Sequence, residues 1–211
     1  WAYTATNVAE NAGVVAMAVT RPGATNLTNT VTYTFTAGSA TAVSDYAATN
    51  GTLTFAPGDA SKTVSLTVIN DNLIETNETL TVSLGSPSGA ALLANTNLVV
   101  TLTESKSGLA WSPATVSVTE TNSGATNTVT VVLVRTGNTN QSVTVGFMTT
   151  NGTASSTSDY TATNGSWLLA AGVLTTNVAI TLPGDDVAES NETFTVILTN
   201  AAATAVLLNT N

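Results

Sequence analysis

The sequence contains neither cysteine nor histidine. Together these two absences exclude Ser-His-Asp and Cys-His catalysis, haem ligation, iron–sulfur clusters, thiolate zinc sites and disulfide scaffolds. The remaining possibilities are chemistry that uses oxygen ligands and roles that need no reaction.

Charged residues are also scarce. They make up 8% of the 211 residues, and 13 acids against 4 bases give a formal net charge of −9. This balance argues against nucleic acid and anionic membrane surfaces as partners. The sequence has no run of about 18 apolar residues, so we expect no membrane insertion. Few charges, no thiols and abundant Thr and Asn suit an extracellular or cell-surface protein, which is the localisation we expect.

The chain opens at Trp1 with neither Met nor a secretory signal, and we interpret it as an excised piece of a larger protein. Its two halves repeat each other. Arg21 corresponds to Arg135 at an offset of 114 residues, and Trp1 corresponds to Trp111 at an offset of 110. We therefore predict two homologous domains, residues 1–107 and 108–211.

Apolar residues recur at every second position in each half, and Thr, Ser and Ala fill most positions between them. The alternating triplets are Val15/Met17/Val19, Val64/Leu66/Val68 and Leu80/Val82/Leu84 in the first half, and Val129/Val131/Leu133, Val178/Ile180/Leu182 and Phe194/Val196/Leu198 in the second. A period of two indicates half-buried antiparallel strands. Six or seven such strands per half predict an all-β fold of two tandem immunoglobulin-like Greek-key β-sandwiches.

The second sandwich is predicted to lack its closing strand. In the first half this strand is the apolar run Leu98–Thr103, and its counterpart would begin after Asn211. A sandwich without its last strand exposes an unpaired edge. The interpretation we favour is a fragment of a longer array, and the alternative is that another chain donates the strand in a fibre.

The acidic residues carry the main functional signal. Ten of the 13 acids form five pairs matched between the halves, which scattered solubilising charges would not do: Glu10/Glu120, Asp45/Asp159, Asp71/Asp185, Glu75/Glu189 and Glu78/Glu192. The hairpin between the strands at 64–68 and 80–84 would bring three of them to one tip, within reach of the loops that hold the other two. Converging carboxylates without nearby bases repel one another, and a cation relieves this. Hard oxygen ligands select Ca²⁺.

Two other interpretations of the same acids stay open. Asp and Asn at strand ends form turns, and rim carboxylates blunt aggregation. A glycoside hydrolase would use two carboxylates as acid and base, about 5 to 9 Å apart. The 5% aromatic content offers little for a sugar-binding cleft. The discriminator is whether the acids face a solvent groove or converge on one point.

The order of short motifs resembles the Calx-beta domain family, which occurs in sodium–calcium exchangers, in integrin β4 and in large bacterial surface proteins. The first half carries Val8-Ala9-Glu10-Asn11-Ala12-Gly13, Arg21-Pro22-Gly23, Asp45-Tyr46, Gly51-Thr52-Leu53-Thr54-Phe55-Ala56-Pro57-Gly58 and Asn70-Asp71. The second carries Val118-Thr119-Glu120, Arg135-Thr136-Gly137, Gly152-Thr153-Ala154, Asp159-Tyr160 and Asp185-Asp186. The resemblance covers the whole chain twice and implies seven-stranded sandwiches with Ca²⁺ at one tip.

The resemblance also implies a set of metal ligands. These are Glu10, Asp45, Asp71, Glu75, Glu78 and Glu104 in the first half, and Glu120, Asp159, Asp185, Asp186, Glu189 and Glu192 in the second. The sequence departs from the family where Asn70 and Gly184 replace the first Asp of the Asp pair. We therefore expect at most one weak Ca²⁺ site per half, in the range of roughly 10⁻⁴ to 10⁻³ M typical of extracellular modules.

From these features we expect a structural or adhesive repeat of an extracellular stalk or filament, stiffened by Ca²⁺, and no enzyme. The expected partners are neighbouring repeats or copies of the chain in a fibre. The alternative is an adhesin module whose loops bind a cell-surface protein or glycan.

Overall fold

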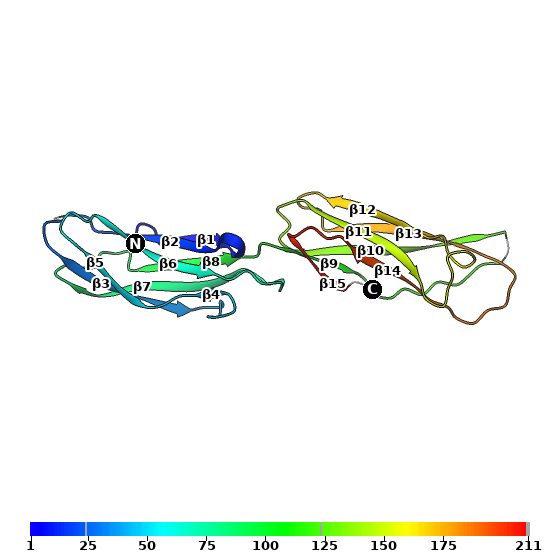
Figure 1. Ribbon diagram of the computed structural model, residues 1–211, viewed down its shortest axis with the longest axis horizontal. Coiled ribbons are helices and arrows are strands. Elements are labelled where there is room, and N and C mark those ends of the chain that lie inside the picture. The colour runs from blue at the N-terminus through cyan, green and yellow to red at the C-terminus, as the bar shows by residue number, and fades with distance from the viewer. Residues whose placement is uncertain (24, 123, 210–211) are drawn as a thin grey trace. The chain divides into compact units, whose positions relative to one another are not determined.

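The computed structural model describes residues 1–23, 25–122 and 124–209. The chain divides into two compact units, Trp1–Ser105 and Lys106–Asn211 (Figure 1). The boundary expected between residues 107 and 108 falls inside a strand, β9 (Ser107–Trp111), which belongs as a whole to unit 2. The fold class is as predicted from the alternation: each unit is an immunoglobulin-like β-sandwich.

Unit 1 is built from two sheets that face each other across one core. Its elements are β1 (Ala5–Ala9), the short 3₁₀ helix η1 (Glu10–Ala12), β2 (Val14–Thr20), β3 (Asn29–Ala37), β4 (Tyr46–Ala47), β5 (Gly51–Phe55), β6 (Ser61–Val68), β7 (Glu78–Ser88) and β8 (Asn97–Thr103). One sheet has the order β1-β8-β7-β3-β5, and the other has the order β2-β6-β4. β8 pairs antiparallel with β7 and parallel with β1.

Unit 2 repeats this plan with one change at each end. Its strands are β9, β10 (Thr126–Gly137), β11 (Val143–Asn151), β12 (Asn164–Leu169), β13 (Thr175–Pro183), β14 (Phe194–Thr199) and β15 (Ala205–Asn209). One sheet has the order β13-β10-β9-β15, and the other has the order β12-β11-β14. Figure 1 shows β15 beside β9, with which it pairs in parallel.

The last strand of unit 2 is not the counterpart of β8. At the offset of 114, β15 corresponds to residues 91–95, which form a loop in unit 1. Among the described residues of unit 2, no strand lies on the free side of β14, where β7 has β8. Residues 115–119, the counterpart of β1, are accordingly not a strand, because β1 is held by its pairing with β8.

The alternating residues form the two cores. In β2, Met17 is fully buried and Val19 nearly so, and Leu66 of the neighbouring strand β6 is fully buried in the same cluster. In unit 2, Ile180 of β13 takes the place of Leu66 and is also fully buried. The intervening threonines face solvent because successive side chains of a strand point to opposite faces. Trp1 and Trp111 are buried as well, so both pack in their units.

Within the described residues, the one helix is η1, and no helix is long and apolar enough to cross a membrane.

Truncating one core residue in each unit should destabilise that unit alone. Leu66→Ala removes a fully buried side chain and should lower the free energy of unfolding of unit 1 by about 2–5 kcal/mol. Ile180→Ala is the matched variant for unit 2. Chemical denaturation followed by residue-resolved NMR measures both transitions separately. If either variant lowered the free energy of unfolding of both units equally, the two cores would not be independent.

Candidate metal centre

Asp45 is fixed by its own loop, which connects β3 to β4. The Thr41 amide donates a hydrogen bond of 2.5 Å to the Asp45 carboxylate, and the Asp45 amide donates to the Thr41 carbonyl at 3.1 Å. The side chain is buried, with 7% of its surface exposed. These contacts hold the carboxylate in one orientation before any ligand arrives.

The loop that carries Asp45 is anchored to the start of β7. The amides of Gly38 and Ala40 both donate to the Thr79 carbonyl, at 3.1 and 3.0 Å, and the Thr79 amide donates to the Ser39 hydroxyl at 2.9 Å. A Cβ added at Gly38 would collide with the Thr79 carbonyl, so only glycine permits this approach. The anchor places Asp45 beside the residues that precede β7.

Glu75 and Glu78 enter the site from that segment. Glu78 is the first residue of β7, and Glu75 lies in the turn before it. The carboxylate oxygens of Asp45, Glu75 and Glu78 can all lie within 4.8 Å of one another. The Glu75 amide donates a hydrogen bond of 2.8 Å to the carboxylate of Glu104, which follows β8 directly. This contact links the segment before β7 to the end of β8.

Glu10, Asp71 and Glu104 surround this triad in unit 1. Glu10 begins η1 at the end of β1 and is buried, with 8% of its surface exposed. Burial raises the pKa of Glu10 to about 7, and the charge of Glu104 beside it and a hydrogen bond with Glu104 add to the rise. Asp71 accepts a hydrogen bond of 2.7 Å from the Leu73 amide, and its charge also raises the pKa of Glu10.

Two members of the triad, Glu75 and Glu78, also have raised pKa values. Burial, a hydrogen bond with Asp45 and the charges of Asp45 and Glu75 raise the pKa of Glu78 to about 7. Burial and the charges of Asp45, Asp71 and Glu104 raise the pKa of Glu75. The structure thus brings together all six residues predicted for the first half.

Unit 2 repeats the triad with Asp159, Glu189 and Glu192, whose oxygens also can lie within 4.8 Å of one another. The Ser155 amide donates to the Asp159 carboxylate at 2.6 Å, as Thr41 does to Asp45. This hydrogen bond, together with one from the Ser158 side chain, lowers the pKa of Asp159. The pKa values of Glu189 and Glu192 are raised, first by desolvation and then by Asp159, but both side chains are exposed.

The remaining residues predicted for the second half do not complete this triad as their counterparts do. Glu120 is exposed, whereas Glu10 is buried. Among the described residues of unit 2, residues 115–119 do not pair with a strand as β1 pairs with β8 in unit 1. Asp185 accepts a hydrogen bond of 2.7 Å from the Val187 amide, in the same turn as Asp71 forms. Asp186 is exposed and lies outside the triad. The site of unit 2 is therefore more open than the site of unit 1.

Sequence reasoning missed the residues that hold the aspartates. Gly38 and its counterpart Gly152 make the same close approach, to Thr79 and Thr193. The amides of Thr41 and Ser155 bind the Asp four residues later. The recurrence of a glycine seven residues before each Asp was the available signal.

These donors fit a hard divalent cation. Three carboxylates offer up to six oxygens, and further acids lie beside them in unit 1, which matches the six to eight oxygen ligands of Ca²⁺. Burial first, and then the charges of the neighbouring acids, raise the pKa values of Glu75 and Glu78. A bound cation would lower this repulsion. The fold and the site together thus define an immunoglobulin-like sandwich that carries at one tip a carboxylate cluster suited to a divalent cation.

Comparison with known proteins agrees with this description. The Calx-beta domain model matches residues 2–107 and 106–211. The chain therefore belongs to the Calx-beta domain family, as two tandem domains, and the resemblance in the sequence is confirmed.

Curated relatives match over a part of their length. Sodium/calcium exchanger 1 of Canis lupus familiaris is 34% identical over 112 residues, which are 52% of this chain and 11% of the exchanger. The same exchanger of Bos taurus is 40% identical over 79 residues, 36% of this chain and 8% of the exchanger. The matching region thus spans about a tenth of these relatives.

Two solved tandem structures share the fold. The crystal structure of CBD12 from CALX1.2 aligns with a TM-score of 0.51 at 24% identity, over 93% of this chain and 77% of that chain. The calcium binding domain CBD12 of CALX1.1 aligns with a TM-score of 0.50 at 23% identity, over 94% and 78%. These likenesses show the fold.

The raised pKa values predict that unit 1 loses stability as the pH rises in calcium-free buffer. The folded unit holds protons on Glu10 and Glu78 up to a pH of about 7, whereas the unfolded chain loses them near pH 4.5. The folded state therefore binds more protons between these values, so its stability falls across pH 4.5 to 7 and levels off above. Thermal melts in EDTA from pH 4.5 to 8 measure this.

Glu10→Gln should flatten the pH dependence of unit 1, because the amide carries no charge to bury. Glu120→Gln is the matched control, since Glu120 is exposed and its replacement should leave the slope unchanged. An unchanged slope in Glu10→Gln would show that the buried Glu10 carboxyl is not its source.

Proposed function

We propose that the chain is a calcium-binding tandem module in which each acidic tip binds one Ca²⁺ ion weakly and is stiffened by it. The observation that carries the proposal is the convergence of Asp45, Glu75 and Glu78, repeated by Asp159, Glu189 and Glu192. One of the two solved structures of similar fold is a calcium binding domain, CBD12 of CALX1.1, which supports the same ligand.

The stiffening follows from where the ligands are attached. In unit 1, Asp45 comes from the loop after β3, Glu75 and Glu78 from the start of β7, and Glu104 from the end of β8. A cation that binds these residues links three segments that are distant in sequence. Because it binds only the folded arrangement, it stabilises the unit by RT ln(1 + [L]/Kd).

We further propose that this module serves as a structural or adhesive repeat of an extracellular or cell-surface protein. The absence of cysteine, the scarcity of charge and the two like units in tandem support this role. Neighbouring repeats or copies of the chain in a fibre are its proposed partners. Cell-surface protein or glycan binding through the loops is the alternative adhesive role.

The geometry favours cation binding over glycoside hydrolysis. The three oxygens of each triad converge within 4.8 Å of one another, whereas an acid–base pair of a glycosidase flanks a sugar with about 5 to 9.5 Å between carboxyl groups. The membership of the chain in the Calx-beta family, which it shares with part of sodium/calcium exchanger 1, is consistent with a non-enzymatic role for the chain.

The test is a thermal melt at pH 7.5 in EDTA and in 10 mM CaCl₂, with 10 mM MgCl₂ as the control cation. With a Kd of about 1 mM, Ca²⁺ should stabilise each occupied unit by about 1.4 kcal/mol, which raises the Tm by several degrees. Unit 1 should respond more than unit 2, because Glu10 and Glu104 complete its site.

Glu78→Gln and Glu192→Gln identify the site that causes each shift. Each variant should abolish the calcium-dependent shift of its own unit and leave the other unit's shift intact. A Tm rise that survives both variants together, or an equal rise with Mg²⁺, would rule out the proposed sites.

A further inference from the structure

Unit 2 has a free sheet edge at β12. This strand ends the sheet β12-β11-β14, and among the described strands it pairs with β11 alone. Its counterpart in unit 1, β5, likewise ends the sheet β1-β8-β7-β3-β5, which has its closing strand β8. β8 joins that sheet at β7, the counterpart of β14. A strand in the place of β8 would therefore join unit 2 at β14 and leave the edge at β12 free.

The backbone of β12 offers hydrogen-bonding groups along this edge. The Thr149 amide donates to the Thr163 carbonyl at 2.9 Å, which fixes the alternation of bonded and non-bonded residue pairs along β11 and β12. By this alternation the odd-numbered residues of β12 bond to β11. The even-numbered residues direct their N–H and C=O groups to the free edge, and all three are exposed: Asn164, Ser166 and Leu168.

The side chains at the end of β12 are apolar and face solvent. Leu168 has 70% of its surface exposed, and Val173 and Leu174, in the turn that follows β12, are exposed as well. Single exposed apolar residues are ordinary on a protein surface, whereas a group of them at one place marks a site of interaction.

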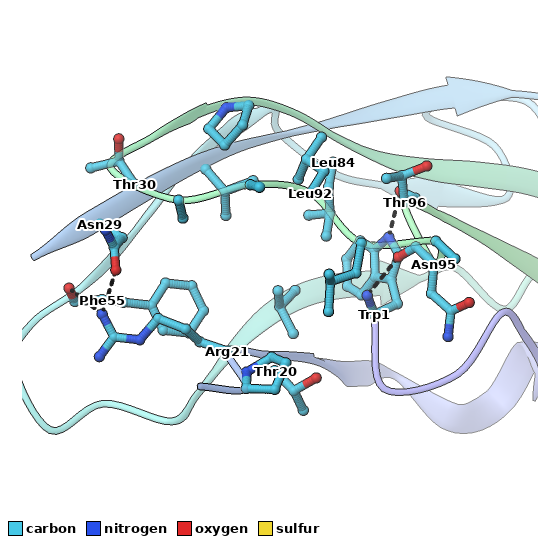
Figure 2. Close-up of a pocket in the computed structure, with 18 of the residues that line it drawn as sticks. Trp1, Thr20, Arg21, Asn29, Thr30, Phe55, Leu84, Leu92, Asn95 and Thr96 are labelled. Carbon is cyan, nitrogen blue, oxygen red and sulfur yellow. Dashed lines mark hydrogen bonds between the residues drawn. The ribbon is translucent and has the colours of Figure 1, made fainter. Parts of the chain in front are cut away.

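The counterpart strand β5 presents a polar residue instead. Phe55, its last residue, is buried in unit 1, and the guanidinium carbon of Arg21 lies 5.4 Å from the centre of its ring (Figure 2). Because successive side chains of a strand point to opposite faces, Thr54 faces outward and is exposed. Thr54 takes the place of Leu168 at the offset of 114, so the exposed leucine is particular to unit 2.

Unit 1 also carries residues that keep a sheet edge from pairing. Pro57 follows β5, and Asp59 and Lys62 form an ion pair of 2.8 Å at the turn into β6. Proline and charged side chains, lysine above all, are common means of preventing an edge strand from adding another strand. At the three matched positions unit 2 has residues without charge or a proline ring: Ala171, Val173 and Thr176.

The edge carries no charge that would repel a second copy. Residues 160–184 contain no Asp, Glu, Lys or Arg, although the chain has a net charge of −9. The acids of the triad lie toward the start of β12: Asp159 precedes β12, and Glu192 precedes β14, which runs in the same direction because both strands are antiparallel to β11. An antiparallel pair of β12 strands thus places the two triads at opposite ends.

We propose that two copies of the chain associate through β12, as an antiparallel pair of strands related by a twofold axis. Such a pair is self-complementary, since both strands present the same alternation of donors and acceptors. The two three-stranded sheets become one continuous sheet, and Leu168 packs against the partner copy. This contact specifies how copies of the chain meet and to that extent rests on the structural role proposed above, but the calcium sites take no part in it.

The first test is sedimentation velocity of the full chain in EDTA, from micromolar to millimolar concentration. We expect a monomer–dimer equilibrium. Leu168→Lys places a charge on the edge in both copies and should leave only monomer, and its exposed position lets the variant fold. Thr54→Lys is the matched control in unit 1 and should leave the dimer unchanged.

Three results would overturn the proposal: a monomer at every concentration for the unaltered chain, a dimer that survives Leu168→Lys, or equal loss of the dimer in Thr54→Lys. Because calcium is absent throughout, none of them bears on the calcium-dependent rise in Tm, so the two proposals fail separately.

The absence of cysteine from the chain permits a second test at the strand itself. Ser166→Cys carries a nitroxide label at the edge of β12, and Thr52→Cys carries it at the matched position of β5. The EPR spectrum of the label at residue 166 should broaden by contact between copies and should sharpen when unlabelled chain is added in excess. The label at residue 52 should show no such change. Broadening at residue 52 and not at residue 166 would assign the contact to unit 1 and refute pairing through β12.

Discussion

The parallel pairing of β1 with β8 is the contact on which the acidic site of unit 1 depends. β1 leads directly into Glu10, and β8 ends directly before Glu104, so their pairing brings both carboxyls to the tip. The described part of unit 2 has no such pairing. Residues 115–119 form no strand and Glu120 is exposed, although the triad of Asp159, Glu189 and Glu192 still assembles. The triad therefore assembles without the pairing of β1 with β8, whereas in unit 1 that pairing positions Glu10 and Glu104.

The cost of gathering carboxylates explains why a cation would matter to this molecule. The chain has few bases, so repulsion at the tips is relieved by protons on Glu10 and Glu78 or by a divalent ion. Above pH 7 these protons are largely lost, so that a divalent ion would be the remaining partner able to relieve the repulsion. Weak binding is enough, because the free energy of unfolding of a natural domain is itself only about 5–15 kcal/mol.

The sequence by itself determined the fold class, the repeat and the identity of the triads. Alternation of apolar residues needs no tertiary information, because it reflects the geometry of a single strand, and matched acids at a fixed offset show where a site recurs. The tertiary structure decided which acids meet. Glu10 and Glu120 occupy equivalent positions in the sequence, yet one is buried and the other exposed, because only long-range strand pairing fixes the edge.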